Sequence, residues 1–210
     1  MFFCKPKIAE PASERQVRIL DAAEQVFARA GFHSATMNDV AREAAMSPGN
    51  LYRYFPSKDA IIAALAERDR TEIAADFQSL DAGKGNVLDQ LEALGRRHLV
   101  EEPREKAVLA VQIWAEAARN GEMAKMCAAI DGTVFNGMAE AFASAKANGE
   151  LPANLDDKRY LNAIFMMADG FFCRRATDPN FDPHDAADTL FAAMRGLATV
   201  LIMPESGGTT

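Results

Sequence analysis

Residues 36–58, TMNDVAREAAMSPGNLYRYFPSK, constrain the fold of this chain more than any other stretch. Thr36 is a good N-cap, and Asp39 favours a helix start because its carboxylate complements the free amide groups there. The apolar spacing is then interrupted, and Ser47 and Pro48 fit the cap and the first turn of a second helix. The stretch therefore predicts two short helices joined by a tight turn, with a third helix about to begin.

The second of these helices, expected over residues 48–55, has two contrasting faces. Side chains three or four residues apart share one face of a helix, so Leu51 and Phe55 are predicted to point into a core. The opposite face presents Gly49, Asn50, Arg53 and Tyr54, with Tyr52 at the edge. Arginine and asparagine can bond base edges in the DNA major groove, and tyrosine hydroxyls can reach phosphates. We therefore expect this helix to enter the major groove, with a purely structural surface helix as the alternative.

The order and spacing of these residues also carry a resemblance to a known family. The matching residues are Thr36-x-x-Asp39-Val40-Ala41, Ala44, Ser47-x-x-x-Leu51-Tyr52-x-Tyr54-Phe55 and Lys58, within a match from about Ser13 to Leu65. The pattern resembles the DNA-binding domain of the TetR/AcrR family of bacterial repressors. That resemblance implies an all-helical homodimer with an N-terminal operator-reading domain and a larger C-terminal domain that binds a small molecule.

The groove geometry of that family implies a role for each exposed residue of the two helices. The expected contacts to the DNA backbone are Thr36, Tyr52, Tyr54 and Lys58, and the ammonium group of Lys58 is expected to be free for a phosphate. The expected base-reading residues are Asn38, Asn50 and Arg53, while Gly49 lets the helix approach the bases closely. For Arg53 alone, a surface salt bridge is the alternative.

Apolar residues recur at helical spacing through the rest of the chain, and no strand pattern interrupts them. Helices are expected to begin near residues 13, 36, 48, 58, 87, 107, 122, 154 and 183. The predicted fold class is therefore all-α, with about nine helices. We expect a flexible arm over residues 1–12, a helix-turn-helix domain over 13–58, an effector-binding and dimerisation domain over 59–204, and a disordered tail over 205–210.

The net charge of −7 is distributed unevenly, which matters for a chain predicted to bind DNA. Residues 1–70 contain ten lysines and arginines against nine acidic residues, a net charge of +1, whereas residues 71–210 carry −8. The acidic excess therefore lies outside the predicted DNA-binding domain. A dimer that makes few phosphate contacts does not need an overall basic protein.

Several protein classes are disfavoured by the composition. No apolar run approaches the roughly 18 residues of a membrane span, the N-terminus is a poor signal peptide, and three separated cysteines argue against a disulfide framework or a zinc site. We therefore expect a cytoplasmic protein without a cofactor or metal. His33, His98 and His184 are isolated, and common catalytic motifs are absent. A helical-bundle enzyme or a protein-interaction module without DNA binding remains the alternative.

Two segments of the C-terminal half resemble parts of the same family. Residues 113–123 resemble the junction between its sixth and seventh helices, most of all in the choline-responsive BetI type. Ala168-Asp169-Gly170-Phe171-Phe172 resembles an eighth-helix motif that often lies at the dimer interface. The C-terminal domains of this family vary widely, so the ligand class does not transfer with the fold.

A ligand pocket is expected among the fourth to eighth helices. The candidate lining residues are Phe77, Trp114, Met123, Met126, Phe135, Phe165 and Met166, with Asp169 as a candidate counter-charge. Methionine and aromatic side chains suit an unidentified apolar or cationic aromatic ligand. For each apolar residue the alternative is a place in the core, and for Asp169 it is a hydrogen bond at the dimer interface.

The eighth and ninth helices are expected to form the dimer interface by packing against their copies as a four-helix bundle. The candidate residues are Phe172, Leu190, Phe191, Met194, Leu197 and Val200. The ninth helix supports this expectation because its apolar stripe is broader than one internal contact requires. Arg174 and Arg175 are expected either to pair with acids across that interface or to be solvated.

The complete functional prediction is a transcriptional repressor that a small-molecule ligand releases from a palindromic operator. In the DNA-bound dimer the two recognition helices would lie about 34–36 Å apart, one turn of DNA. A ligand between the C-terminal helices is expected to shift the fourth helix and to move the two DNA-binding domains out of register. A ligand that tightened operator binding would instead indicate a corepressor.

Overall fold

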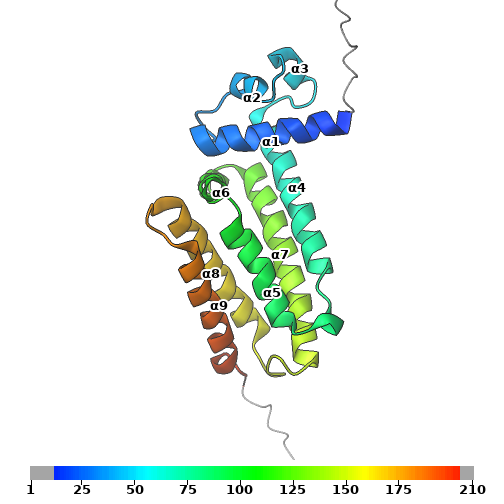
Figure 1. Ribbon diagram of the computed structural model, residues 1–210, viewed down its shortest axis with the longest axis vertical. Coiled ribbons are helices and arrows are strands. Elements are labelled where there is room, and N and C mark those ends of the chain that lie inside the picture. Colours follow the sequence, from blue (N-terminus) through cyan, green and yellow to red (C-terminus); the bar gives the residue numbers. More distant parts are fainter. Residues whose placement is uncertain (1–11, 204–210) are drawn as a thin grey trace, which may run out of the picture. The chain divides into compact units, whose positions relative to one another are not determined.

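The computed structural model describes residues 12–203, which form a helical fold without a sheet in that range (Figure 1). Its α-helices are α1 (Ala12–Ala30), α2 (Met37–Glu43), α3 (Pro48–Tyr52), α4 (Lys58–Gln78), α5 (Val87–Arg96), α6 (Arg104–Ala117), α7 (Gly121–Ala147), α8 (Asp157–Thr177) and α9 (Pro183–Val200). A 3-10 helix, η1 (Ala82–Lys84), precedes α5, and a π-helix, η2 (Arg97–Glu101), follows it. The predicted all-α fold is confirmed. The expected tail, and the expected arm apart from Ala12, lie outside the described residues.

The chain divides into two compact units, Met1–Leu65 and Ala66–Thr210, and α4 begins in the first and ends in the second. The sequence predicts a domain boundary between residues 58 and 59, at the start of α4. The structure places it seven residues later because the first turns of α4 contribute to the core of the first unit. Ile61 and Ile62 are 0% and 3% exposed.

The first unit surrounds one apolar core. Its most deeply buried side chains come from all four helices and include Val26, Phe27, Val40, Leu51 and Ile61. Phe32 adds an edge-to-face contact with Phe27, with ring centroids 5.6 Å apart. Because α2 and α3 both contribute to this core, the outward side chains of α3 have a fixed support.

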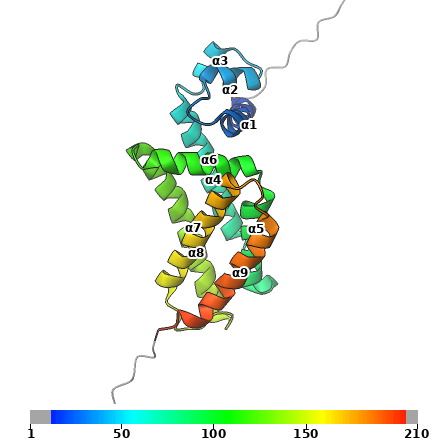
Figure 2. The same ribbon diagram turned by 90° about the vertical axis from the view of Figure 1, so that its left-hand side faces the viewer.

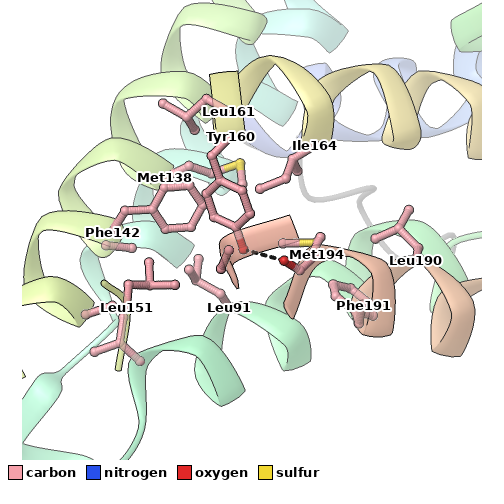
Figure 3. Close-up of a cluster of buried hydrophobic side chains, with 14 of the residues drawn as sticks. Leu91, Met138, Phe142, Leu151, Tyr160, Leu161, Ile164, Leu190, Phe191 and Met194 are labelled. Carbon is pink, nitrogen blue, oxygen red and sulfur yellow. Dashed lines mark hydrogen bonds between the residues drawn. The ribbon is translucent and has the colours of Figure 1, made fainter. Parts of the chain in front are cut away.

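In the second unit, α5, α7, α8 and α9 run beside one another, and α6 lies across the upper ends of α7 and α8 (Figure 2). Their shared core contains Phe142, Tyr160 and Phe191 among many aliphatic residues. Figure 3 shows this core, in which the Tyr160 hydroxyl donates a hydrogen bond of 2.9 Å to the backbone carbonyl of Met194. The buried bond adds a directional link between α8 and α9 to their apolar contact.

Arg175, near the end of α8, is buried within its own chain. Its guanidinium donates hydrogen bonds to the backbone carbonyls of Leu99, Val100 and Glu102, at the end of η2. Arg175 therefore neither pairs with acids across a dimer interface nor is solvated, because its donors bind carbonyls that lack helical partners. Arg174, by contrast, is exposed.

Candidate nucleic-acid interface

The start of α2 is stabilised by reciprocal hydrogen bonds between Thr36 and Asp39. The Asp39 amide donates to Thr36 Oγ1 at 3.2 Å, while the Thr36 amide and hydroxyl donate to Asp39 Oδ2 at 3.0 and 2.6 Å. The bond from the Thr36 hydroxyl is the main reason that the pKa of Asp39 lies below its ordinary value. The single donor of that hydroxyl is therefore engaged, and a DNA phosphate would compete with Asp39 for it.

The turn between α2 and α3 is tight. Ala45 has a φ of 52°, in the left-handed region that side chains disfavour. The Ser47 hydroxyl then caps α3 by accepting a hydrogen bond of 3.3 Å from the Asn50 amide. The predicted cap is present, but α3 ends at Tyr52, three residues earlier than expected.

The buried face predicted for α3 is confirmed, and the predicted outward face is exposed in part. Leu51 is fully buried, and Phe55, just beyond the helix, is 7% exposed. Gly49, Tyr52 and Arg53 are exposed, and Asn50 and Tyr54 are half-buried. A Cβ atom on Gly49 would meet no described protein atom within 4 Å, so the fold itself does not require a glycine there.

Arg53 differs from two other arginines of the first unit. Arg42 pairs with Asp39 at 2.6 Å and Arg29 pairs with Glu43 at 2.9 Å. Among residues 12–203, Arg53 forms no ion pair, so the alternative of a surface salt bridge is not realised there. Its guanidinium carries five donors in a planar fork suited to bidentate contacts.

The ammonium group of Lys58 is not free, contrary to the expectation. It donates hydrogen bonds to the backbone carbonyls of Phe32 at 2.7 Å and His33 at 3.1 Å, and it lies 5.0 Å from the centroid of the Phe32 ring. These carbonyls lie in the connection after α1 and need partners that the helix does not supply. Because an ammonium group has three donors, the two bonds leave one for a phosphate.

An open hollow lies on the surface of the first unit beside these groups. Its lining residues are His33, Ala35, Thr36, Met37, Asn38, Tyr52 and Lys58. Its volume is about 320 Å³, some ten times the roughly 30 Å³ share of one liquid water molecule. The hollow brings together four of the eight predicted DNA contacts and adds His33, which had no predicted role. The other four lie on or just after α3, where the Tyr54 hydroxyl accepts a hydrogen bond of 3.4 Å from Arg15.

The residues predicted to line a ligand pocket lie in different environments of the second unit. Met123 is buried, whereas Met166 and Phe135 are 68% and 38% exposed. Met126 is half-buried. Phe77 rests against the backbone of Gly137 and therefore takes part in helix packing. The candidates therefore differ in their exposure, and the pocket stays a prediction.

Two aromatic contacts nevertheless link several of these candidates. Trp114 on α6 meets Phe172 on α8 edge to face, with centroids 5.7 Å apart. Phe135 on α7 lies 6.2 Å from Phe165 on α8. Phe172, predicted for the dimer interface, therefore contacts a residue predicted for the pocket.

Asp169 on α8 has an acidic neighbour on α7, Asp131, which the sequence-based prediction missed. Both side chains reach solvent, yet partial burial raises the pKa of each. The charge of Asp169 raises the pKa of Asp131 further. Asp131 precedes Phe135 by one helical turn and so shares its face, which was the available signal in the sequence.

Three of the six predicted interface residues belong to the core of their own chain. Leu190, Phe191 and Met194 are 7%, 5% and 9% exposed. They are unavailable to a partner because the broad apolar stripe of α9 packs against α5, η2 and α8 at once. Phe172 and Leu197 are half-buried, and Val200 is 67% exposed.

Two further observations concern other kinds of site. Among the described residues, no three histidine, cysteine or carboxylate side chains gather in a group able to hold a metal ion. Within residues 12–203, no helix combines the length and apolarity needed to cross a membrane.

Comparison with known proteins covers both units of the chain. Residues 19–65 match the bacterial regulatory proteins of the tetR family. Residues 88–202 match the C-terminal region of BetI-type transcriptional repressors. The two matches lie in the order expected from the sequence, with the helix-turn-helix first.

Individual relatives agree with these matches. The HTH-type transcriptional regulator UidR of Escherichia coli (strain K12) is 32% identical over 145 residues, which cover 69% of this chain and 73% of UidR. The HTH-type transcriptional repressor KstR of Mycobacterium tuberculosis is 33% identical over 153 residues, covering 68% of this chain and 63% of KstR. The solved structure of Salmonella enterica GusR has a TM-score of 0.73 at 30% identity, covering 92% of this chain and 99% of GusR.

Proposed function

Because the chain belongs to the TetR family of bacterial regulatory proteins, we propose that it represses transcription by binding a palindromic operator as a homodimer. The family consists of DNA-binding transcriptional regulators, so the chain is a regulator of this type and not an enzyme. The proposed site of action is the bacterial chromosome, in the cytoplasm. The proposed control is release from the operator by a small-molecule ligand.

The observation that carries the proposal is that α3 buries one face in the core and exposes the other. Leu51 anchors the helix in the core, while Arg53 projects its donors outward without an ion pair among the described residues. We assign Arg53, Asn50 and Asn38 to base edges, with a bidentate contact from Arg53 to guanine. Gly49 lets α3 approach the floor of the major groove closely. This role accounts for the glycine, because packing within the described chain does not require one at this position.

The backbone contacts in this proposal come from Tyr52, Tyr54, Thr36 and Lys58. Tyr52 is 52% exposed and is the best placed of the four. Thr36 and Lys58 contribute less than a free hydroxyl or ammonium group would, because both already form hydrogen bonds within the chain. Their bonds instead hold α2 and the connection after α1 in position for DNA.

The proposed dimer surface uses the exposed stripes of α8 and α9. On α8 the stripe contains Met166, Gly170 and Cys173, and on α9 it contains Ala192, Gly196 and Val200. Each set has the spacing of one helical face, and its small residues allow two helices to approach closely. The large exposed area of Met166 and Val200 supports burial of these stripes against a second copy.

The proposed ligand is an apolar or cationic aromatic molecule that binds among the C-terminal helices. The aromatic pairs Trp114–Phe172 and Phe135–Phe165 offer apolar contact. Asp131 and Asp169 favour a cation, because positive charge relieves the repulsion between their carboxylates. To release the operator, the ligand must bind the DNA-incompetent state more tightly than the competent one.

The test is a selection of random-sequence duplexes on the purified protein, read by sequencing. We expect a palindromic consensus with the wild-type dimer, relaxed at one position of each half-site with Arg53→Ala or Asn50→Ala. Glu140→Ala serves as the matched control, because this exposed residue of α7 is distant in sequence from the helix-turn-helix. No enrichment by a folded dimer at low salt would overturn the proposal. A non-palindromic consensus would retain DNA binding and remove the two-fold arrangement.

A further inference from the structure

The hollow of the first unit is bordered by groups from four parts of the chain. Thr36 and Asn38 come from the start of α2, Tyr52 from α3 and Lys58 from the start of α4. His33 completes the border from the connection between α1 and α2. The hollow therefore combines the Asn38 amide and the Tyr52 phenol with the Lys58 ammonium group and an imidazole that can be protonated.

His33 is held beside this cation by its own backbone. The Lys58 ammonium binds the His33 carbonyl at 3.1 Å and the Phe32 carbonyl at 2.7 Å, so the connection is tied to α4. The Phe32 ring adds an edge contact to the imidazole, with centroids 5.6 Å apart. His33 is an exposed residue and is one of those that line the hollow.

We propose that this hollow receives one phosphate group of the DNA backbone and that His33 binds it in the protonated form, so that DNA binding takes up a proton. The inference rests on the proposed DNA interface, and it adds a residue and a pH dependence to it. A phosphate brings negative charge beside Lys58 and favours the imidazolium over the neutral ring. The contact is to the backbone, so it strengthens binding to every sequence alike.

The hollow also contains the phenol of Tyr52 and the ammonium group of Lys58. Unperturbed phenols and lysine ammonium groups have pKa values near 10. Asp39 stays ionised between pH 6 and 7.5, because its bonds with Thr36 keep its pKa below the ordinary value. A change in affinity within this range that depends on residue 33 therefore reports the imidazole.

The experiment measures the affinity of the full-length protein for a palindromic duplex from the selection at pH 6.0 and 7.5, at constant ionic strength. A mixed-sequence duplex at low salt is measured in parallel. For wild type we expect affinity at pH 6.0 to exceed that at pH 7.5 by about four-fold per protomer, the effect of a one-unit preference of the complex for the protonated ring. His33→Gln should lose most of this gain on both duplexes.

Two further variants complete the test. His33→Arg keeps a cation at all pH values and should bind at pH 7.5 at least as tightly as wild type binds at pH 6.0, with little pH dependence. His184→Gln, which alters an exposed histidine of α9, should retain the wild-type dependence. An unchanged dependence in folded His33→Gln would overturn the inference and leave DNA binding intact. Failure of wild type to bind either duplex would overturn the proposed function itself.

Discussion

The ring of Phe77 on α4 lies against the backbone of Gly137 on α7. A Cβ atom at Gly137 would fall 2.7 Å from Cδ1 of the ring and closer still to Cγ. The contact explains a glycine in the middle of a helix, where it costs about 1 kcal/mol relative to alanine. The Phe77 ring occupies the space that a side chain in place of Gly137 would fill.

We expect Gly137→Ala to lower the free energy of unfolding by about 1–3 kcal/mol, because the Phe77 ring must move out of its packed position. Thermal and denaturant unfolding followed by circular dichroism would measure the change. Gly132→Ala is the matched control on the same helix, since its Cβ would meet no described atom within 4 Å. That control should be neutral or stabilise the protein by up to about 1 kcal/mol. Equal effects of the two substitutions would contradict the close contact.

Removal of the Tyr160 hydroxyl should weaken the link between α8 and α9. Tyr160→Phe loses the bond to the Met194 carbonyl, and we expect a loss of about 1 kcal/mol in the free energy of unfolding at pH 7.5. Urea unfolding at that pH is the measurement. A variant as stable as wild type would show that the bond adds nothing beyond the apolar contact of the ring.

Ionisation of the same hydroxyl should lower the stability of the protein at high pH. Burial raises the pKa of Tyr160 to about 12, from an ordinary value near 10. Between these values the unfolded chain releases the proton first, so this contribution to stability is complete below pH 10 and is lost as the pH rises through 12. Relative to Tyr160→Phe, wild type should lose roughly 1 kcal/mol by pH 11. Parallel pH dependences of the two proteins would contradict burial of the phenol.

Arg175 and its neighbour Arg174 offer a matched comparison of a buried and an exposed arginine. Arg175→Met leaves three carbonyls at the end of η2 without their donor, and we expect a loss of about 3 kcal/mol or more in the free energy of unfolding. Arg174→Met should change it by no more than about 0.5 kcal/mol. Chemical unfolding of both variants is the measurement, and similar values would contradict the assigned role of Arg175.

Features governed by local rules could be predicted from the sequence. The caps at Thr36 and Ser47, and the burial of Leu51 and Phe55, depend on residues within a few positions of each other. The contacts of Lys58 depend on carbonyls about 25 residues earlier in the chain, which no local pattern reveals. The hollow and the place of His33 beside it follow from that distant contact.

The C-terminal half shows the same limit for apolar residues. Helical spacing identified the apolar stripe of α9, but spacing does not say whether the stripe faces its own chain or a partner. Phe191 illustrates this, because its ring packs against Gly95 of α5 and fills the core of the protomer. The residues of α9 that stay exposed include small ones such as Gly196, which hydrophobicity alone does not select.

Substitutions of Lys58 and Arg53 should distinguish a residue that supports the DNA interface from a residue that reads the DNA sequence. Lys58→Met loses two hydrogen bonds to the connection after α1, so we expect lower stability of the first unit together with weaker binding to all duplexes alike. Arg53→Ala should leave stability within about 0.5 kcal/mol of wild type and cost about 1–3 kcal/mol of discrimination at one base pair. Unfolding curves and titrations across single-base operator variants measure both effects. Unfolding of Lys58→Met at the wild-type denaturant concentration would show that the bonds to Phe32 and His33 do not stabilise the connection. Unchanged base preferences in Arg53→Ala would show that Arg53 does not read a base.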